Sequence, residues 1–549
     1  MQGPGGHDLD TSAKIREKID AELAVLHARV RVLHAKRNTL SLLYSLPSDI
    51  LICVFIEYQK TITISSSLAD HKKYRAWIKI LQITQHLREI GLQSPELWSD
   101  IVVTDRHWVS KFVKRSGSHD LNVKLWVDKP HFVKPLKQVI GELERISALN
   151  VFLDGKYWKD ILPALKGPAP RLKLLRLHVH IKSGNEHPSI PVDLFSETHP
   201  KLKDLSVMSC NLDLMAPLFT MTDLTNLCIT SPKNLFPISE VLRVLQNQPA
   251  LRSLTLRHTL AAGEAGGGSP VHLPSLTSLQ IEHEVDLETN NSFLASLILP
   301  ETVDIDLSSS AVPFQPQGFV VSAIDSAKRA TQNASLEFRD IQIDWGTNSL
   351  LVVCMKQPRS LSGKLSLPFV RMKFTFDREL APEDQDKWLT GLPNWLLLPL
   401  EVLQFQGYGP TSPEIWGYLS RLIPGLQHLL LGIDQDMRPL VEYFRLQYPV
   451  ESSALPIVAD DEKLEADKEV GMVYPALRRL TLFNPSYECL VALCHPLAIR
   501  RKRGVGLDEL SLVEWTPRRT EGRDKIDLMF RDKVNVIRWM EMDDLPMVV

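Results

Sequence analysis

The 549-residue sequence has few cysteines, no long apolar run and almost no excess of charge. Six cysteines are too few for a disulfide framework, so we expect a reducing compartment. With 63 Lys and Arg against 65 Asp and Glu, the formal net charge is −2, which argues against nucleic acid as the main ligand. No apolar run approaches the ~18 residues of a membrane span, and the polar N-terminus is not typical of a secretory signal. We therefore expect a cytoplasmic or nuclear protein that does not bind membranes.

The sequence also lacks the motifs of common catalytic sites. No phosphate-binding, dinucleotide-binding, nucleophile-elbow or zinc-protease signature occurs. His178, His180 and His187 alternate near a loop, which is more typical of surface histidines than of metal ligands, and Cys489 and Cys494 lack zinc spacing. We predict that the chain is not an enzyme and has neither a cofactor nor a metal site.

A basic cluster, Arg500-Arg501-Lys502-Arg503, stands near the C-terminus. Two interpretations of it stay open. It is either a solvated loop or a nuclear import signal.

The N-terminal segment predicts one long helix. Residues 1–11 are polar and Gly-rich, and we expect them to be disordered. Over residues 12–41, with Thr11 or Ser12 as a cap, apolar residues recur at three- and four-residue steps. The residues of this narrow stripe are Ile19, Leu23, Leu26, Val30, Leu33 and Leu40. Because a lone helix is weakly stable, we expect the stripe to pack on the next domain or, alternatively, on a second copy as a coiled coil.

Residues 42–101 predict a small helical domain. Pro47 stands where a helix start tolerates its missing N–H, and Asp49 suits the helix dipole. Ile50, Leu51, Val54 and Phe55 then form one expected apolar face. In the second half, Ile80, Ile83, Leu87 and Ile90 form another helical stripe before the turn at residues 94–98.

These residues resemble a known family. The segment 46–51 (LPSDIL) followed by Phe55 resembles the opening of F-box domains, and residues 83–90 (ITQHLREI) with 94–98 (SPELW) resemble the second half of the F-box-like variant found in mushroom-forming fungi. A charged helix ending Arg-Asn-x-Leu commonly precedes the box in that variant, and residues 37–40 (RNTL) fit it.

The resemblance implies docking onto the Skp-type adaptor of a cullin-RING (SCF) ubiquitin ligase. It assigns adaptor contacts to eight residues, namely Leu46, Pro47, Ile50, Leu51, Phe55, Ile83, Leu87 and Trp98. The same side chains could instead form the core of the domain. We favour the core for Phe55, Ile83 and Trp98 and the partner for Leu46 and Pro47.

Residues 102–549 contain a recurring pattern, Pro-x-Leu-x-x-Leu-x-(Leu/Ile/Val), and adjacent copies start 22 to 30 residues apart. Its six full copies begin at Pro170, Pro200, Pro249, Pro274, Pro424 and Pro475. This spacing resembles leucine-rich repeats. Each Leu-x-Leu pair places both side chains on one face of a short strand, and intervening helices such as 238–246 would cover the other side. Because no unit buries its face alone, the pattern predicts a stacked, parallel-strand α/β solenoid.

The repeat pattern is degenerate. Only the copy from Leu202 to Leu212 carries the whole pattern, with Cys210 at the usual Asn/Cys position. Residues 311–398 have no clean copy but contain strand-like runs at 335–345, 350–355 and 370–376, so drifted repeats and an inserted β-rich subdomain both stay open. Residues 261–270 and 451–471 are expected to be flexible loops.

Together these observations predict a non-catalytic substrate receptor of an SCF-type ubiquitin ligase. The F-box-like domain would bind the Skp-type adaptor and cullin core, while the repeats would bind an unknown protein substrate. The alternative is a leucine-rich-repeat scaffold whose F-box-like domain no longer engages a ligase. Leu87, at a position where the family usually has Trp, favours that alternative.

Overall fold

The structure is a computed structural model. It describes residues 6–64, 73–103, 106–181, 187–195, 201–220, 224–263, 269–283, 287–312, 316–332, 337–356, 369–376, 378–397, 399–407, 409–432, 436–447, 473–513 and 521–541. The chain divides into two compact units, Met1–Asp204 and Leu205–Val549, which are considered separately. The loop expected at 451–471 and residues 264–268 of the loop expected at 261–270 lie outside the described residues.

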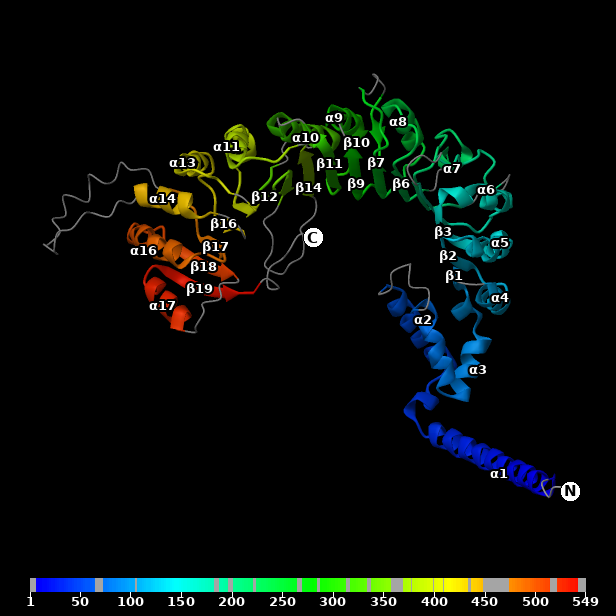
Figure 1. Cartoon of the computed structure of the whole chain (residues 1–549). Coiled ribbons are helices and arrows are strands. Elements are labelled where there is room, and N and C mark those ends of the chain that lie inside the picture. Colours follow the sequence, from blue (N-terminus) through cyan, green and yellow to red (C-terminus); the bar gives the residue numbers. More distant parts are fainter. Residues whose placement is uncertain are drawn as a thin grey trace, which may run out of the picture. The chain divides into compact units, whose positions relative to one another are not determined.

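The first unit begins with helices (Figure 1). Their bounds are α1 Gly6–Thr39, η1 Leu42–Ser45, α2 Ser48–Ile64, η2 Lys73–Gln82, α3 Gln85–Gln93 and η3 Pro95–Trp98, where η marks a 3₁₀ helix. Helix α1 starts at Gly6, so the prediction of disorder up to residue 11 and of a cap at Thr11 or Ser12 is wrong for residues 6–12, whose backbone continues the helix. Residues 1–5 lie outside the described part.

An aromatic core joins the helical domain to the first strand. Trp98 donates its indole N–H to the carbonyl of Gly91 at 2.8 Å. Its ring meets Trp77 and Phe112 edge-on, with centroids 5.3 and 5.1 Å away. A Cβ at Gly91 would lie 2.2 Å from a methyl group of Leu81, so a larger residue at this position would displace the Leu81 side chain. Since Phe112 belongs to the next helix, the helical domain and the strands after it share one core.

Four parallel strands complete the first unit, with helices on one face of the sheet (Figure 1). The elements are β1 Asp100–Val103, α4 Arg106–Arg115, β2 Leu121–Val127, η4 Pro130–Phe132, α5 Val133–Ile140, η5 Leu143–Arg145, β3 Ile146–Asp154, η6 Gly155–Tyr157, α6 Trp158–Ile161, η7 Leu162–Lys166 and β4 Leu174–His180. In β2, Leu121, Val123 and Leu125 are buried and alternate with more exposed residues. The helices therefore cover one face, and the other carries the polar and aromatic side chains.

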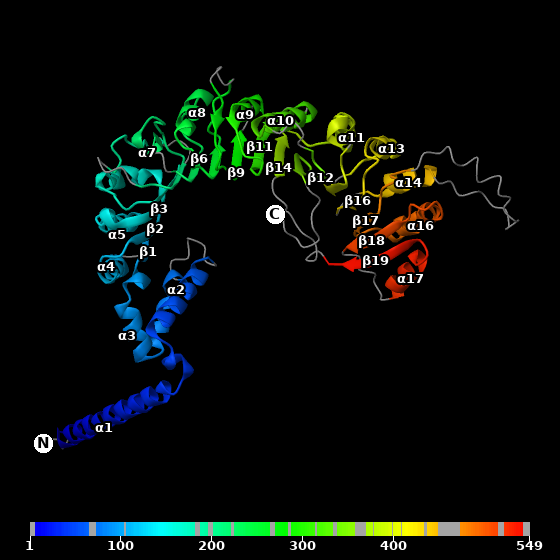
Figure 2. The same cartoon turned by 180° about the vertical axis from the view of Figure 1, so that it is seen from behind.

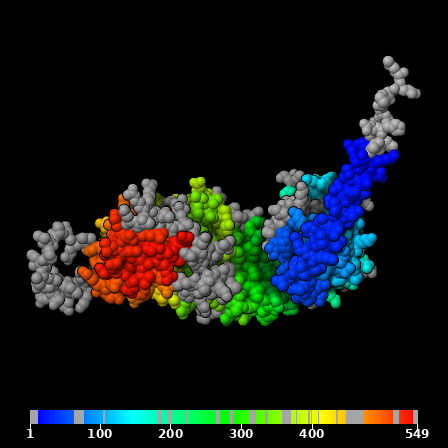
Figure 3. Space-filling model, turned by 90° about the horizontal axis from the view of Figure 1, so that it is seen from below, coloured from blue at the N-terminus to red at the C-terminus, as the bar shows by residue number. Residues whose placement is uncertain are grey.

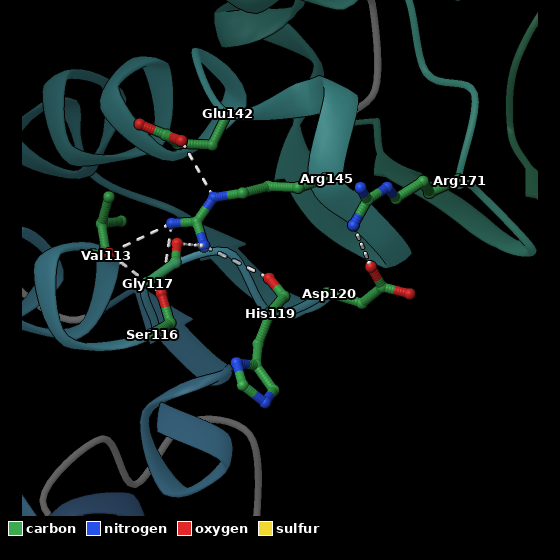
Figure 4. A network of polar contacts seen from close by, with 8 residues as sticks. All are labelled: Val113, Ser116, Gly117, His119, Asp120, Glu142, Arg145 and Arg171. Carbon is green, nitrogen blue, oxygen red and sulfur yellow. Dashed lines mark hydrogen bonds and ion pairs between the residues drawn. The ribbon is translucent and has the colours of Figure 1, made fainter. Parts of the chain in front are cut away.

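Arg145 links three segments of this unit (Figure 4). Its guanidinium donates to the carbonyl oxygens of Val113 at 3.1 Å and His119 at 3.2 Å and to that of Gly117. It also donates to the Ser116 hydroxyl at 3.1 Å and to the Glu142 carboxylate at 2.9 Å. All five N–H donors of the side chain are thus used, and they fix the C-terminal end of α4 and the turn after it.

We predict that Arg145→Lys lowers the free energy of unfolding by about 1–3 kcal/mol, because three rotatable ammonium donors cannot satisfy five fixed acceptors. Urea unfolding of the full chain measures this change in the free energy of unfolding. Arg171→Lys is the matched control, since Arg171 is exposed and makes an ion pair with Asp120 at 2.7 Å. That variant should change stability by less than about 0.5 kcal/mol. Equal losses in the two variants would contradict the assignment.

The second unit alternates strands and helices. Its elements up to the middle stretch are β5 Asp204–Met208, α7 Pro217–Thr220, β6 Asn226–Thr230, α8 Ile238–Gln246, β7 Ser253–Arg257, β8 Val271–His272, β9 Ser278–His283, α9 Leu287–Ala295, β10 Leu297–Ile298, β11 Asp304–Val312 and α10 Pro316–Ala330. Strands β6, β7, β9 and β11 pair in parallel in that order, while β8 and β10 form a separate pair.

The middle stretch continues the same sheet and adds an antiparallel strand to it. Strands β12 Asp340–Trp345, β13 Ser349–Met355 and β14 Phe369–Phe376 confirm the three predicted strand runs. β14 pairs in parallel with β11, β13 lies antiparallel between β14 and β12, and β12 pairs in parallel with β15. The spatial order β11-β14-β13-β12-β15 therefore inserts one antiparallel strand without interrupting the sheet.

The remaining elements return to parallel order. They are α11 Pro382–Thr390, α12 Asn394–Leu397, β15 Val402–Gly407, α13 Pro413–Leu422, β16 His428–Leu431, α14 Arg438–Gln447, β17 Arg479–Phe483, α16 Tyr487–Lys502, β18 Leu507–Val513, α17 Glu521–Phe530 and β19 Val534–Met540. Strands β15 to β19 pair successively in parallel. Seen from both sides, the helices of this unit lie along one face of its sheet (Figures 1 and 2).

The side chains of the Leu-x-Leu pairs are buried, as the pattern predicts. Every Leu, Ile or Val of the pairs at 175/177, 205/207, 254/256, 279/281, 429/431 and 480/482 is at most 1% exposed. Thr259 stands at a degenerate Asn/Cys position, yet its hydroxyl donates to the carbonyl of Ile229 at 3.0 Å or of Arg257 at 2.9 Å. The chain is therefore a mixed α/β protein whose sheets are mostly parallel and open.

Candidate functional site

The structure divides the eight predicted adaptor-contact residues into two groups. Leu51, Phe55, Leu87 and Trp98 are at most 3% exposed and form the core of the helical domain. The core assignment that we favoured for Phe55 and Trp98 is confirmed, and Leu51 and Leu87, to which the resemblance assigns adaptor contacts, are also core residues whose side chains have no exposed surface in this conformation. Leu46, Pro47, Ile50 and Ile83 are exposed.

The core assignment that we favoured for Ile83 is wrong. Its side chain is 65% exposed, since it lies in the connection before α3 rather than on the buried side of that helix. Thr84 caps α3 by accepting the backbone N–H of Leu87 at 3.2 Å. The helical stripe therefore begins one turn later than the periodicity alone indicates.

Helix α2 buries only half of its expected apolar face. Leu51 and Phe55 point into the core, while Ile50 and Val54 are 48% and 49% exposed. All four residues were expected on one apolar face, but a wide apolar arc on a helix can contribute to a core and to an outer surface together. Val54 is thus a surface residue that the predicted set missed, and its i, i+4 spacing from Ile50 is the signal that could have found it.

Local structure holds the exposed residues in place. The carbonyl of Pro47 accepts the N–H groups of Ile50 and Leu51 and so starts α2. Tyr44 in η1 stacks on His86 in α3 with ring centroids 4.5 Å apart, which brings η1 against the first turn of α3. We call the exposed apolar set on these elements the docking surface. Its members are Leu42, Leu43, Leu46, Pro47, Ile50, Val54 and Ile83.

The uncovered face of the first sheet carries an aromatic row. Trp126, Phe152 and His178 occupy matching positions on β2, β3 and β4. Trp126 stacks on Phe152 with centroids 5.5 Å apart, and Phe152 meets the edge of His178 at 4.7 Å. Burial and the nearby Arg176 cation lower the pKa of His178, which keeps the ring neutral. Such a row gives a protein partner a flat apolar contact with polar edges.

The uncovered face of the second sheet contains a polar hollow of about 500 Å³. It lies over β9, β11, β14, β13 and β12 and is lined by residues that alternate with the buried ones. Its charged lining residues are Glu282, Asp306, Asp344, Arg371 and Lys373. Both signs of charge therefore meet in one concave surface.

Burial tunes the acids of this hollow. Burial raises the pKa of Asp344 and of Asp306. At Asp306 the Arg371 and Arg257 cations offset only part of this rise. Arg371 lies 4.0 Å from Asp306, and Glu282 lies 3.5 Å from Arg257 and 3.4 Å from His258. The hollow can accept polar or charged groups of a partner.

Among the residues singled out for other chemistry, Arg500 has a structural role. In the described ranges, no group of three or more His, Cys, Asp or Glu is placed to hold a metal ion. Arg500, Arg501 and Lys502 end helix α16, so the solvated-loop interpretation is wrong for them. Arg500 is fully buried and donates to backbone carbonyls, so it is not available to an import receptor. Among the helices described, none is long and apolar enough to cross a bilayer.

Comparison with known proteins adds no assignment. No model of a known protein family matches this sequence, and no curated protein matches it.

Proposed function

We propose that this chain is a non-catalytic substrate receptor of an SCF-type ubiquitin ligase. The helical domain at 42–101 docks on a Skp-type adaptor, and the repeats, which we interpret as a degenerate leucine-rich-repeat solenoid, bind a target protein. No residue of the chain then performs chemistry. Tethering alone raises the effective concentration of the target near the transferred ubiquitin.

The observation that carries the proposal is the docking surface. Leu46, Ile50 and Ile83 are 37%, 48% and 65% exposed on a domain whose core is tightly packed. So many exposed apolar side chains on so small a domain are costly in water and are typical of a site for a protein partner. The residues exposed there include half of those to which the F-box resemblance assigns adaptor contacts, and the buried half gives that surface a rigid support.

The uncovered sheet faces supply the surfaces for a target. The aromatic row of the first unit offers Trp126 and Phe152 as anchors, and the polar hollow of the second unit offers charged groups of both signs. Aromatic anchors and desolvated charges are the groups that dominate protein–protein affinity. Such surfaces favour a folded protein or peptide over a small apolar ligand.

Co-purification with the Skp-type adaptor of the host tests the proposal. The full chain, co-expressed with the adaptor, should form a stable complex. The double variants Leu46→Ala/Pro47→Ala and Ile50→Glu/Ile83→Glu should weaken it at least about tenfold, because they remove apolar contacts from the centre of the interface. Since these side chains are exposed, both variants should keep the melting temperature of the wild type.

Leu528→Glu is the matched control, because Leu528 is also exposed but lies on α17 in the second unit. It should leave the complex unchanged. If the wild-type chain forms no complex, the chain is a scaffold whose F-box-like domain does not engage a ligase, and the ubiquitin assignment falls. If the docking-surface variants bind the adaptor as tightly as the wild type does, another surface binds the adaptor.

A further inference from the structure

Helix α1 leaves its apolar stripe exposed. Ile19, Leu23, Leu26, Val30 and Leu33 are each 44–58% exposed, and the expected packing of this stripe on the next domain is not present among the described residues. The helix extends from the helical domain in Figures 1 and 2 and is the dark-blue projection in Figure 3. Because an isolated helix of this kind is marginal in water, something must cover the stripe.

The stripe has the spacing of a coiled coil. Ile19, Leu26 and Leu33 fall at d positions, and Leu23, Val30 and Arg37 fall at a positions of successive heptads. Val25 and Val32 lie on a different side of the helix, at c positions, and are also exposed. One narrow seam therefore runs from Ile19 to Leu33, with Arg16 and Arg37 at the a positions that flank it.

Charge along α1 is strongly asymmetric. All its acidic residues lie between Gly6 and Glu22, whereas the part from Leu23 to Thr39 has no Asp or Glu. That second part carries Arg29, Arg31, Lys36 and Arg37. Two copies that align in parallel would place basic half on basic half and Arg37 against Arg37 in the seam. An antiparallel arrangement can instead set residues 34–39 of each copy, with Lys36 and Arg37, against residues 17–22 of the other, with Glu17, Asp20 and Glu22.

We infer that α1 covers its stripe by pairing antiparallel with α1 of a second copy of this chain. In the matching register Leu23 faces Leu33 of the second copy, and Leu26 faces Val30 of the second copy. Arg37 then faces Ile19 instead of another arginine, with its aliphatic stem on the seam and its cation in water. Glu22 and Lys36 of the second copy flank the seam with opposite charges, and this occurs twice by symmetry.

This arrangement has a consequence for the rest of the chain. The two-fold axis lies near Ala28, about eleven residues before the end of each helix, so the C-terminal ends of the two helices would be roughly 33 Å apart. A dimer would therefore display two copies of the docking surface and of the sheet faces. The inference does not depend on what the docking surface binds.

Sedimentation velocity of the full-length chain over a concentration series tests the inference. We expect the mass to rise from the 62.2 kDa of one chain toward twice that value at tens of micromolar. Leu26→Glu/Leu33→Glu should keep the chain monomeric throughout. The matched control Val25→Glu/Val32→Glu adds the same charges to the same helix off the seam and should dimerise like the wild type.

Charge reversal tests the direction of pairing. Glu22→Lys should weaken dimerisation about tenfold, and adding Lys36→Glu should restore it to within about threefold, because the two groups face each other only in the antiparallel register. Melting temperatures confirm that every variant is folded. A wild-type chain that stays monomeric overturns the inference, as does a dimer that survives the Leu26→Glu/Leu33→Glu change. A dimer that the second reversal fails to restore overturns the antiparallel register.

Discussion

Replacing Arg500 with methionine should destabilise the second unit by about 3–5 kcal/mol. The guanidinium is fully buried and donates to the carbonyl of Tyr474 at 3.0 Å, that of Leu477 at 3.3 Å and that of Val473. These carbonyls belong to the turn that precedes β17. Methionine fills a similar volume but leaves all three acceptors without those donors in the interior.

Strain in the same turn adds to the expected effect. Tyr474 has a φ of 44°, in the left-handed region that non-glycine residues avoid. Its ring is buried, and its hydroxyl donates to the carbonyl of Trp416 at 3.2 Å. Without Arg500, fewer contacts hold this conformation.

Urea unfolding of the full chain and hydrogen exchange over residues 473–483 measure the result. We expect a lower midpoint of unfolding and faster exchange in this segment. Arg501→Met is the matched control, because the adjacent Arg501 is exposed, and it should change stability by less than about 0.5 kcal/mol. If the two variants behave alike, Arg500 does not hold the turn.

Replacing Gly407 with alanine should cost about 3–5 kcal/mol. A Cβ at this position would lie 2.2 Å from the carbonyl oxygen of Trp345 in the neighbouring strand β12. That atom belongs to the backbone, so the strands must separate to relieve the overlap. The φ of 72° at Gly407 adds the strain of a left-handed conformation.

Gly504→Ala separates these two costs. Gly504 has a similar φ of 80°, but a Cβ there would meet nothing within 4 Å. It should therefore lose only about 1–2 kcal/mol. Thermal unfolding followed by circular dichroism compares the two variants. Equal losses would mean that backbone strain dominates and that β12 and β15 tolerate the added methyl group.

The sequence by itself predicted much of the second unit correctly. The Leu-x-Leu spacing identified the strands and the face that they bury, because alternation along a strand leaves little choice of register when one face is covered. The strand runs in the middle stretch were also visible. Their order in space was not, because the pairing of β13 between β14 and β12 depends on contacts between residues far apart in the sequence.

The candidate docking surface was predicted less completely. The F-box-like spacing located the segment, but the sequence could not divide Ile50, Leu51, Val54 and Phe55 between core and surface. All four are apolar, and periodicity reports which side of a helix is apolar rather than how much of that side a neighbour covers. Only the packing of η2 and α3 against α2 made Leu51 and Phe55 core residues and left Ile50 and Val54 outside.

Composition and periodicity determined that the chain has helices and parallel strands with Leu-rich buried faces and a long, charged N-terminal helix. The tertiary structure alone decided that Arg500 is buried rather than solvated and that Gly407 must be a glycine. It also decided that the stripe of α1 has no covering neighbour in the described chain. Local patterns depend on residues a few positions apart, whereas burial, close backbone approach and exposure depend on segments that only the folded chain brings together.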